Sequence, residues 1–128
     1  MRVQESVLAL IEAHCPIECI TTEFPRTLAV DAASLCAEWP LIGARSLPEG
    51  SVAALFGARC VVFEAPEHWG GALHGEASGL AQFQALIRVP GHQACIALAA
   101  RDGEMLDPAQ GSGPWAFLGQ AVAAALAR

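Results

Sequence analysis

Charged residues are scarce in this sequence. Only 16% of its 128 residues are charged, and 7 basic residues stand against 13 acidic ones, which gives a net charge of −6. General nucleic-acid binding depends on Lys and Arg side chains that displace counterions from phosphates. Because the few basic residues are scattered along the chain, the composition argues against a nucleic-acid partner.

Signals for membranes and secretion are also missing. No apolar run reaches the roughly 18 residues that a transmembrane helix needs. The first residues carry Gln4, Glu5 and Glu12 and lack a small-residue cleavage site, so they predict a helix and not a secretory signal. We therefore expect a cytoplasmic protein without a membrane partner. Five cysteines, an odd number, make a disulfide framework an unfavourable interpretation in that compartment.

Hydrophobic residues, by contrast, are abundant. They make up 54% of the chain, which excludes disorder, and 128 residues suit a single domain with its own core. We therefore treat residues 1–128 as one domain. The low charge also suggests a surface that a second copy covers in part.

Hydrophobic spacing predicts helices at both ends of the chain. Residues 2–13 place Val3, Val7, Leu8 and Ile11 on one face. A second helix begins at Pro16, buries Ile17, Ile20 and Phe24, and is stopped by Pro25. The last helix is capped by Ser112, has Pro114 in its first turn, and presents one apolar stripe. That stripe consists of Trp115, Leu118, Val122 and Leu126.

The middle of the chain predicts strands. They cover residues 27–39, 60–65, 82–90 and 94–102, and the turn at 90–92 makes the last two a hairpin. A short helix at 47–57 ends at Gly57, and the irregular segment 66–80 holds a short helix near 75–78. Adjacent strands with helices at both ends predict an α+β fold, in which an antiparallel sheet has the N- and C-terminal helices packed on one face.

Five segments in this order resemble a GAF domain. More narrowly, they are similar to a proteobacterial GAF-like family, domain-of-unknown-function family 484. The segments are residues 7–13, 28–38, 43–57, 75–90 and 97–126. The resemblance implies a sensory or regulatory module whose six-stranded or similar sheet holds a small molecule on the face opposite its terminal helices. Those helices commonly dimerise, so a homodimer is expected. Members usually carry a long helical segment ahead of this domain, so we expect a short homologue or an excised domain.

The glycine-punctuated segment 66–80 supplies the candidate ligand-binding residues. Loops over a sheet are where binding residues concentrate, and glycines permit close backbone approach. Arg45 could hold a carboxylate or phosphate by paired hydrogen bonds, although a surface salt bridge is the favoured interpretation of this residue. An exposed loop whose tryptophan fills a small core is the alternative for the whole segment. The candidate site residues are Trp39, Arg45, Phe63, His68, Trp69, His74 and Glu76.

The cysteines predict no catalytic or metal site. "HCPIEC" at 14–19 lacks the second cluster that a tetrahedral metal site requires, which favours packing or a free thiol. Cys36, Cys60 and Cys95 fall on predicted strands and are expected to pack as small hydrophobic residues.

We therefore predict a non-catalytic sensory or regulatory module with no identified cofactor. One alternative is a GAF-fold thiol-dependent reductase acting on free methionine sulfoxide. Another is tetrapyrrole binding through Cys60, His68 or His74.

Overall fold

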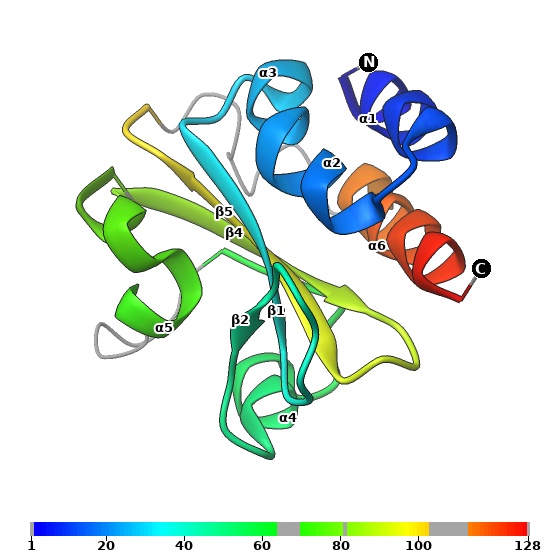
Figure 1. The fold of residues 1–128 in the computed structure, drawn as a ribbon. Helices are drawn as coiled ribbons and strands as arrows, with labels where there is room; N and C mark the ends of the chain where they lie inside the picture. The colour runs from blue at the N-terminus through cyan, green and yellow to red at the C-terminus, as the bar shows by residue number, and fades with distance from the viewer. Residues whose placement is uncertain (1, 64–69, 81, 103–112, 128) are drawn as a thin grey trace.

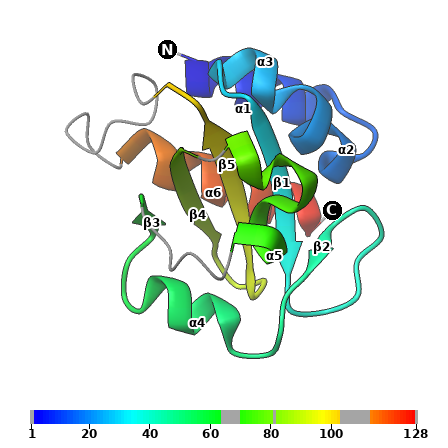
Figure 2. The same cartoon turned by 90° about the vertical axis from the view of Figure 1, so that its left-hand side faces the viewer.

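The computed structural model of the protein describes residues 2–63, 70–80, 82–102 and 113–127. It is an α+β fold, as the sequence predicts, and helices lie on both faces of its one sheet (Figures 1 and 2). The elements are α1 (Arg2–Glu12), α2 (Pro16–Thr22), α3 (Phe24–Leu28), β1 (Ala32–Ala37), β2 (Arg45–Ser46), α4 (Ser51–Phe56), β3 (Val61–Val62), α5 (Gly70–His74), the 3₁₀-helix η2 (Gly75–Leu80), β4 (Phe83–Val89), β5 (Ala94–Ala100) and α6 (Gly113–Leu126).

The sheet has the strand order β2-β1-β5-β4-β3. All its pairs are antiparallel except β1 with β2, which is parallel. The predicted hairpin is confirmed as β4 and β5. Every residue of β5 is buried, because this central strand is covered on both faces and carries only small or aliphatic side chains. The strand therefore sits where the two cores of the protein meet.

The terminal helices cover one face of the sheet, as predicted. In Figure 1, α1, α2, α3 and α6 lie on one side of the sheet and α5 lies on the other. Helix α6 packs on β4 and on α1, while α2 packs on β1. Fully buried side chains from both chain ends meet strand residues in this layer. They include Leu10, Ile20, Phe24, Leu118 and Val122.

The chain before β1 is helical for longer than predicted. Pro25 does not stop a helix; it lies in the first turn of α3, where a proline costs no hydrogen bond and its fixed φ suits the helix. Thr27 and Leu28 therefore belong to α3 and not to a strand. Ala29, with φ 57° in the left-handed region, ends that helix, and the strand begins only at Ala32.

The strands β2 and β3 also depart from the prediction. The parallel strand β2 has two residues and was not predicted, because so short a segment has no detectable alternation. Only Val61 and Val62 of the predicted 60–65 strand are paired, and residues 64 and 65 lie outside the described residues. Cys60 is exposed at the bend before β3, so the prediction that it packs in the core is wrong.

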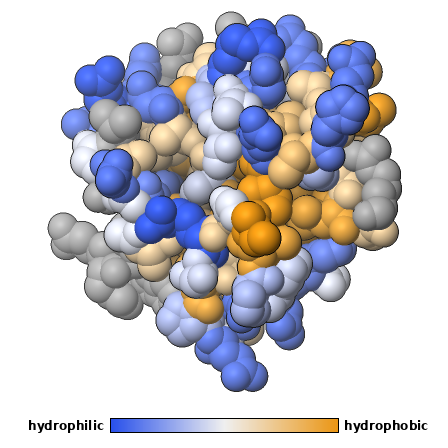
Figure 3. Space-filling model, in the orientation of Figure 1, coloured by the Kyte–Doolittle hydropathy of each residue, from blue (hydrophilic) through white to orange (hydrophobic). Residues whose placement is uncertain are grey.

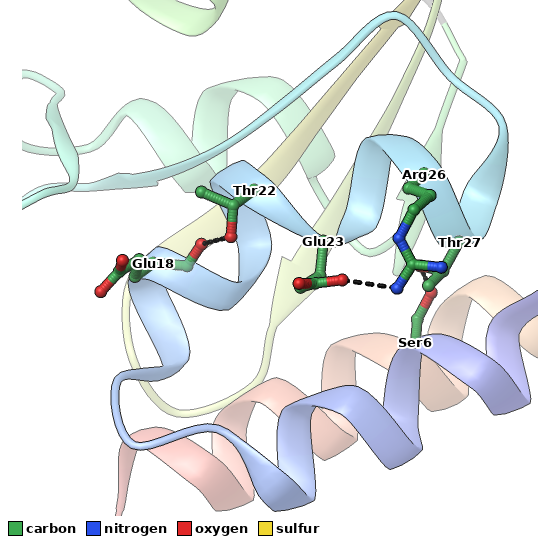
Figure 4. A network of polar contacts seen from close by, with 6 residues as sticks. All are labelled: Ser6, Glu18, Thr22, Glu23, Arg26 and Thr27. Atoms are coloured by element: carbon green, nitrogen blue, oxygen red, sulfur yellow. Dashed lines mark hydrogen bonds and ion pairs between the residues drawn. The ribbon is translucent and has the colours of Figure 1, made fainter.

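Helix α1 buries a different stripe from the predicted one. Its buried residues are Val3, Ser6 and Leu10, whereas Leu8 and Ile11 are 59% and 60% exposed. The rotation is explained by Ser6, whose hydroxyl hydrogen-bonds the buried Thr27 hydroxyl of α3 (Figure 4). Both hydroxyls need a partner inside the core. Pairing them turns two large apolar side chains toward the surface.

The start of helix α4 is capped by the carboxylate of Glu38, the residue after β1. The two oxygens of Glu38 accept hydrogen bonds from the backbone amides of Gly50, at 2.7 Å, and Val52, at 2.8 Å. We expect Glu38→Ala to lower the free energy of unfolding by about 1–2 kcal/mol, since both amides lose a charged acceptor. Chemical denaturation measures the change. Glu49→Ala, at an exposed position beside the same helix, is the control, and equal losses in the two variants would contradict the capping role.

Candidate functional site

A row of four side chains crosses the sheet on the face opposite the terminal helices. Arg45 of β2 pairs with Cys36 of β1, Cys36 with Cys95 of β5, and Cys95 with Arg88 of β4. Directly paired residues point to the same face of a sheet. The two cysteines are free thiols, 0% exposed, in a core shared with α4 and α5. A buried dithiol thus lies between two arginines of the sheet.

Helix α5 is held over this row by side chains of the sheet. The Arg45 guanidinium donates to the carbonyls of Ala72 and Gly71, both at 3.0 Å. The Ser34 hydroxyl donates to the carbonyl of Leu73 at 2.8 Å. The last carbonyls of a helix lack donors within that helix, and a positive charge is favourable there. These contacts fix a five-residue helix that is too short to be stable by itself.

Gly75 allows the arginine to come this close. A Cβ at this position would overlap the Arg45 guanidinium, and the residue has φ +56° in the left-handed region. Glycine satisfies both conditions without strain. The sequence signal for this feature was the glycine-rich segment itself, which indicated close approach but not by which side chain.

The two thiols differ in acidity. The Cys36 thiol donates to the Leu73 carbonyl at 3.5 Å. Its pKa is lowered chiefly by the hydrogen bond from Cys95, with help from Ser34 and the charge of Arg45, against the opposing effect of burial. The hydrogen bond to Cys36 and burial raise the pKa of Cys95 well above its usual value. Cys36 is therefore the thiol of the pair that ionises first.

His74, at the end of α5, is buried beside this row. Its Nε2 lies 2.9 Å from Oε1 of Gln84 on β4. Burial lowers the pKa of His74, and the positive charge of Arg45 lowers it further, whereas the bond to Gln84 acts in the opposite direction. The ring is thus kept neutral, and in the tautomer protonated at Nε2 it donates to the glutamine.

The buried histidine predicts a loss of stability in mild acid. Because the pKa of His74 is lower in the folded protein than its ordinary 6.5, the unfolded chain binds the proton more readily. The free energy of unfolding should be unaffected above pH 6.5, the ordinary pKa. It should fall as the pH drops below 6.5 toward the lower pKa that His74 has in the folded protein. Urea denaturation at pH 7.5 and 5 measures this difference. It should shrink in His74→Gln and persist in His14→Gln, which changes an exposed ring; equal pH dependence in both variants would contradict the assignment.

The structure brings together only some of the residues predicted to bind a ligand. Arg45, which holds α5, and His74, at the end of α5, are near neighbours. Glu76 is exposed on η2. Trp39 follows β1, where its Nε1 donates to the carbonyl of His92 at 2.6 Å. Phe63 packs on the core beneath the terminal helices, on the opposite face from His74.

Two further residues of that prediction, His68 and Trp69, lie outside the described residues. The paired thiols, in contrast, were missed as a pair. Their strands are distant in sequence, and the register that opposes Cys36 to Cys95 has no local signal. Their burial was predicted and is confirmed.

Two depressions mark the helical side of the protein. One, of about 450 Å³, is bordered by α1 and α2 and is lined by Glu12, Glu18, Glu23, His14 and Cys15 among others. Within the described part of the chain, no group of three or more His, Cys, Asp or Glu side chains could hold a metal ion. The other, of about 290 Å³, is an apolar groove lined by Val7, Leu10, Ile11, Ala121, Ala124 and Ala125.

The two helices that border this groove, α1 and α6, also expose large apolar side chains. Leu8, Ile11 and Phe117 are each more than half exposed. Residues 113–127 contain no charged side chain, although Phe117, Gln120, Ala124 and Ala127 all face outward. Figure 3 shows hydrophobic residues extending from the centre of one face toward the side where α6 lies in Figure 1. Surfaces of this kind mark interaction sites.

Comparison with protein families and with curated proteins assigns no class to this chain. A scan against models of protein families found no match, and no curated protein matches the sequence. The resemblance to GAF domains therefore stays a prediction. Among the helices of the described segments, none has the length and apolar character needed to cross a membrane.

Proposed function

We propose that the protein is a non-catalytic regulatory module that works as a homodimer joined through α1 and α6. The regulatory role is the one that the GAF-like resemblance implies. The dimer is supported by a single structural observation, the apolar groove between α1 and α6, which Ile11 lines, on helices that also expose Leu8 and Phe117. Removing such side chains from water contributes about 25 cal/mol for each Å² buried.

A second copy of this chain is the occupant that fits the charge pattern. In a twofold dimer each residue near the axis meets the same surface of the partner, so a charged surface repels itself. The protein carries a net charge of −6, yet the outward stripe of α6 contains no charge at all. The acidic residues of α1, Glu5 and Glu12, are exposed and would lie in the polar rim that interfaces usually have.

The predicted small-molecule site belongs to the other face of the sheet. Arg45 and His74 are the predicted ligand residues that lie together there. Both are engaged within the protein, with α5 and Gln84 respectively. A ligand that reached them would have to displace α5, which gives a physical route from binding to a change of shape.

Native mass spectrometry of protein purified from its own host tests both parts of the proposal. We expect a species of twice 13.3 kDa that retains a small molecule lost on denaturation. A monomer at micromolar concentration would remove the dimer from the proposal. A dimer that carries no extra mass would leave a scaffold and remove ligand sensing.

The paired thiols favour a second candidate, the thiol-dependent reductase acting on free methionine sulfoxide. In such chemistry one cysteine attacks the sulfoxide sulfur and becomes a sulfenic acid as the thioether leaves. The second cysteine then attacks the sulfenic sulfur, which forms a disulfide and releases water. Cys36 and Cys95 are correctly paired but fully buried. If this candidate is right, turnover with dithiothreitol should disappear in Cys36→Ala and Cys95→Ala and persist in Cys60→Ser. Absence of turnover in the wild-type protein would exclude it.

A further inference from the structure

We propose that Cys36 and Cys95 form a redox pair that exchanges with low-molecular-weight disulfides and thereby alters the hold of the sheet on α5. The inference rests on the sheet register and on the contacts of α5. It does not depend on the dimer.

The register places the two sulfurs within bonding reach. Cys36 and Cys95 are direct partners in the antiparallel pair of β1 and β5. Directly opposed Cα atoms lie about 4.5 to 5.5 Å apart in such pairs, and disulfides span about 4.4 to 6.8 Å between Cα atoms. Both side chains are on one face and in one buried cluster. A disulfide can therefore form without changing the strand pairing.

The exchange begins at Cys36. Its thiolate attacks one sulfur of the external disulfide and releases one thiol of the oxidant. The Cys95 thiol then loses its proton, and its sulfur attacks the Cys36 sulfur and releases the second thiol. Two electrons and two protons pass from the protein to the oxidant. The asymmetry of the pair decides the order, because the pKa of Cys36 is lowered while that of Cys95 is raised.

Oxidation changes the contacts of α5 in a defined way. The reduced Cys36 thiol donates to the Leu73 carbonyl, which Ser34 also binds. A disulfide has no S–H, so the carbonyl loses one of its two donors. Access is controlled by the same helix, because both thiols are 0% exposed and Leu73 packs in their cluster. Reaction therefore requires local opening of α5.

The experiment uses the full chain with Cys15→Ser and Cys60→Ser, which removes the two exposed thiols. The folded protein is equilibrated with mixtures of oxidised and reduced glutathione, quenched in acid and digested for mass spectrometry. Cys19 is the internal control, because it is buried on the other face of the sheet. We expect a cross-linked peptide joining Cys36 and Cys95 to increase with the oxidised fraction while Cys19 stays reduced.

Two further measurements keep the inference open to refutation. In Cys95→Ala, Cys36 should accumulate as a mixed disulfide with glutathione, and in wild type the amides of α5 should exchange faster with deuterium after oxidation. If Cys36 and Cys95 remain as reduced as Cys19 at every glutathione ratio, in protein with unchanged circular dichroism, the pair is not redox-active. If the disulfide forms but exchange in α5 does not change, the effect on α5 is wrong.

Discussion

Gly119→Ala should destabilise the protein by about 1–3 kcal/mol, which is the usual range for overpacking a well-filled core. Gly119 lies in α6 where the helix crosses β4. A Cβ there would overlap the carbonyl oxygen of Arg88 and come within 2.9 Å of the Ile87 side chain. The first of these atoms belongs to the backbone of a paired strand and cannot move away, so α6 must lift from the sheet. Alanine's better helix propensity recovers at most about 1 kcal/mol.

The matched control is Gly113→Ala at the start of the same helix. A Cβ on Gly113 meets no atom within 4 Å, so that change should leave stability equal or slightly higher. Urea denaturation followed by circular dichroism measures both variants. If Gly119→Ala proves as stable as Gly113→Ala, the close packing of α6 on β4 is wrong.

Ala124→Glu should weaken the proposed dimer about a hundredfold or more. Ala124 is exposed on α6 and lines the apolar groove. Symmetry would bring two new carboxylates into one desolvated surface, and like charges opposed in this way cost several kcal/mol. Each tenfold change in Kd corresponds to about 1.4 kcal/mol. The folded monomer should persist, since the residue faces solvent within one copy.

Size-exclusion chromatography with light scattering compares this variant with Ala53→Glu. Ala53 is an exposed alanine of α4, so the control adds the same charge to a helix on another part of the molecule. We expect a monomer for Ala124→Glu and an unchanged dimer for Ala53→Glu. Dissociation by both variants would point to net charge as the cause, and dissociation by neither would place the interface elsewhere.

Sequence reasoning succeeded where a pattern is local and long. The hairpin of β4 and β5 carries its own turn at Pro90-Gly91-His92, and the stripe of α6 repeats over about three turns. Trp115, Leu118 and Val122 are buried as predicted. Gly57 ends α4 as predicted. In each case the residues that fix the element lie within the element.

Sequence reasoning failed where a residue distant in sequence determines which side chains are buried. Leu8 and Ile11 have the spacing of a buried face, but the partner of Ser6 is Thr27 on another helix. The helical spacing of α1 alone could not show which flank would be covered. Phe63 was predicted to line a pocket because of its aromatic side chain. It follows β3 directly, and the alternation of the strand places it on the helical face.

The candidate site shows the same limit. Arg45 was predicted to be functional because its guanidinium can bind acidic groups, and in the structure it binds backbone carbonyls of α5 instead. The sequence showed that Arg45 could donate paired hydrogen bonds, but it did not show which group would accept them. The opposition of Cys36 and Cys95 depends on a register between strands about sixty residues apart, and no single-strand pattern encodes it.

Sedimentation equilibrium of the wild-type protein tests the central claim, that the uncovered apolar surface of α1 and α6 joins two copies. Over a series of concentrations the average mass should rise from 13.3 kDa toward twice that value and follow a single monomer–dimer equilibrium. A mass that stays at 13.3 kDa up to the highest concentration would contradict the account.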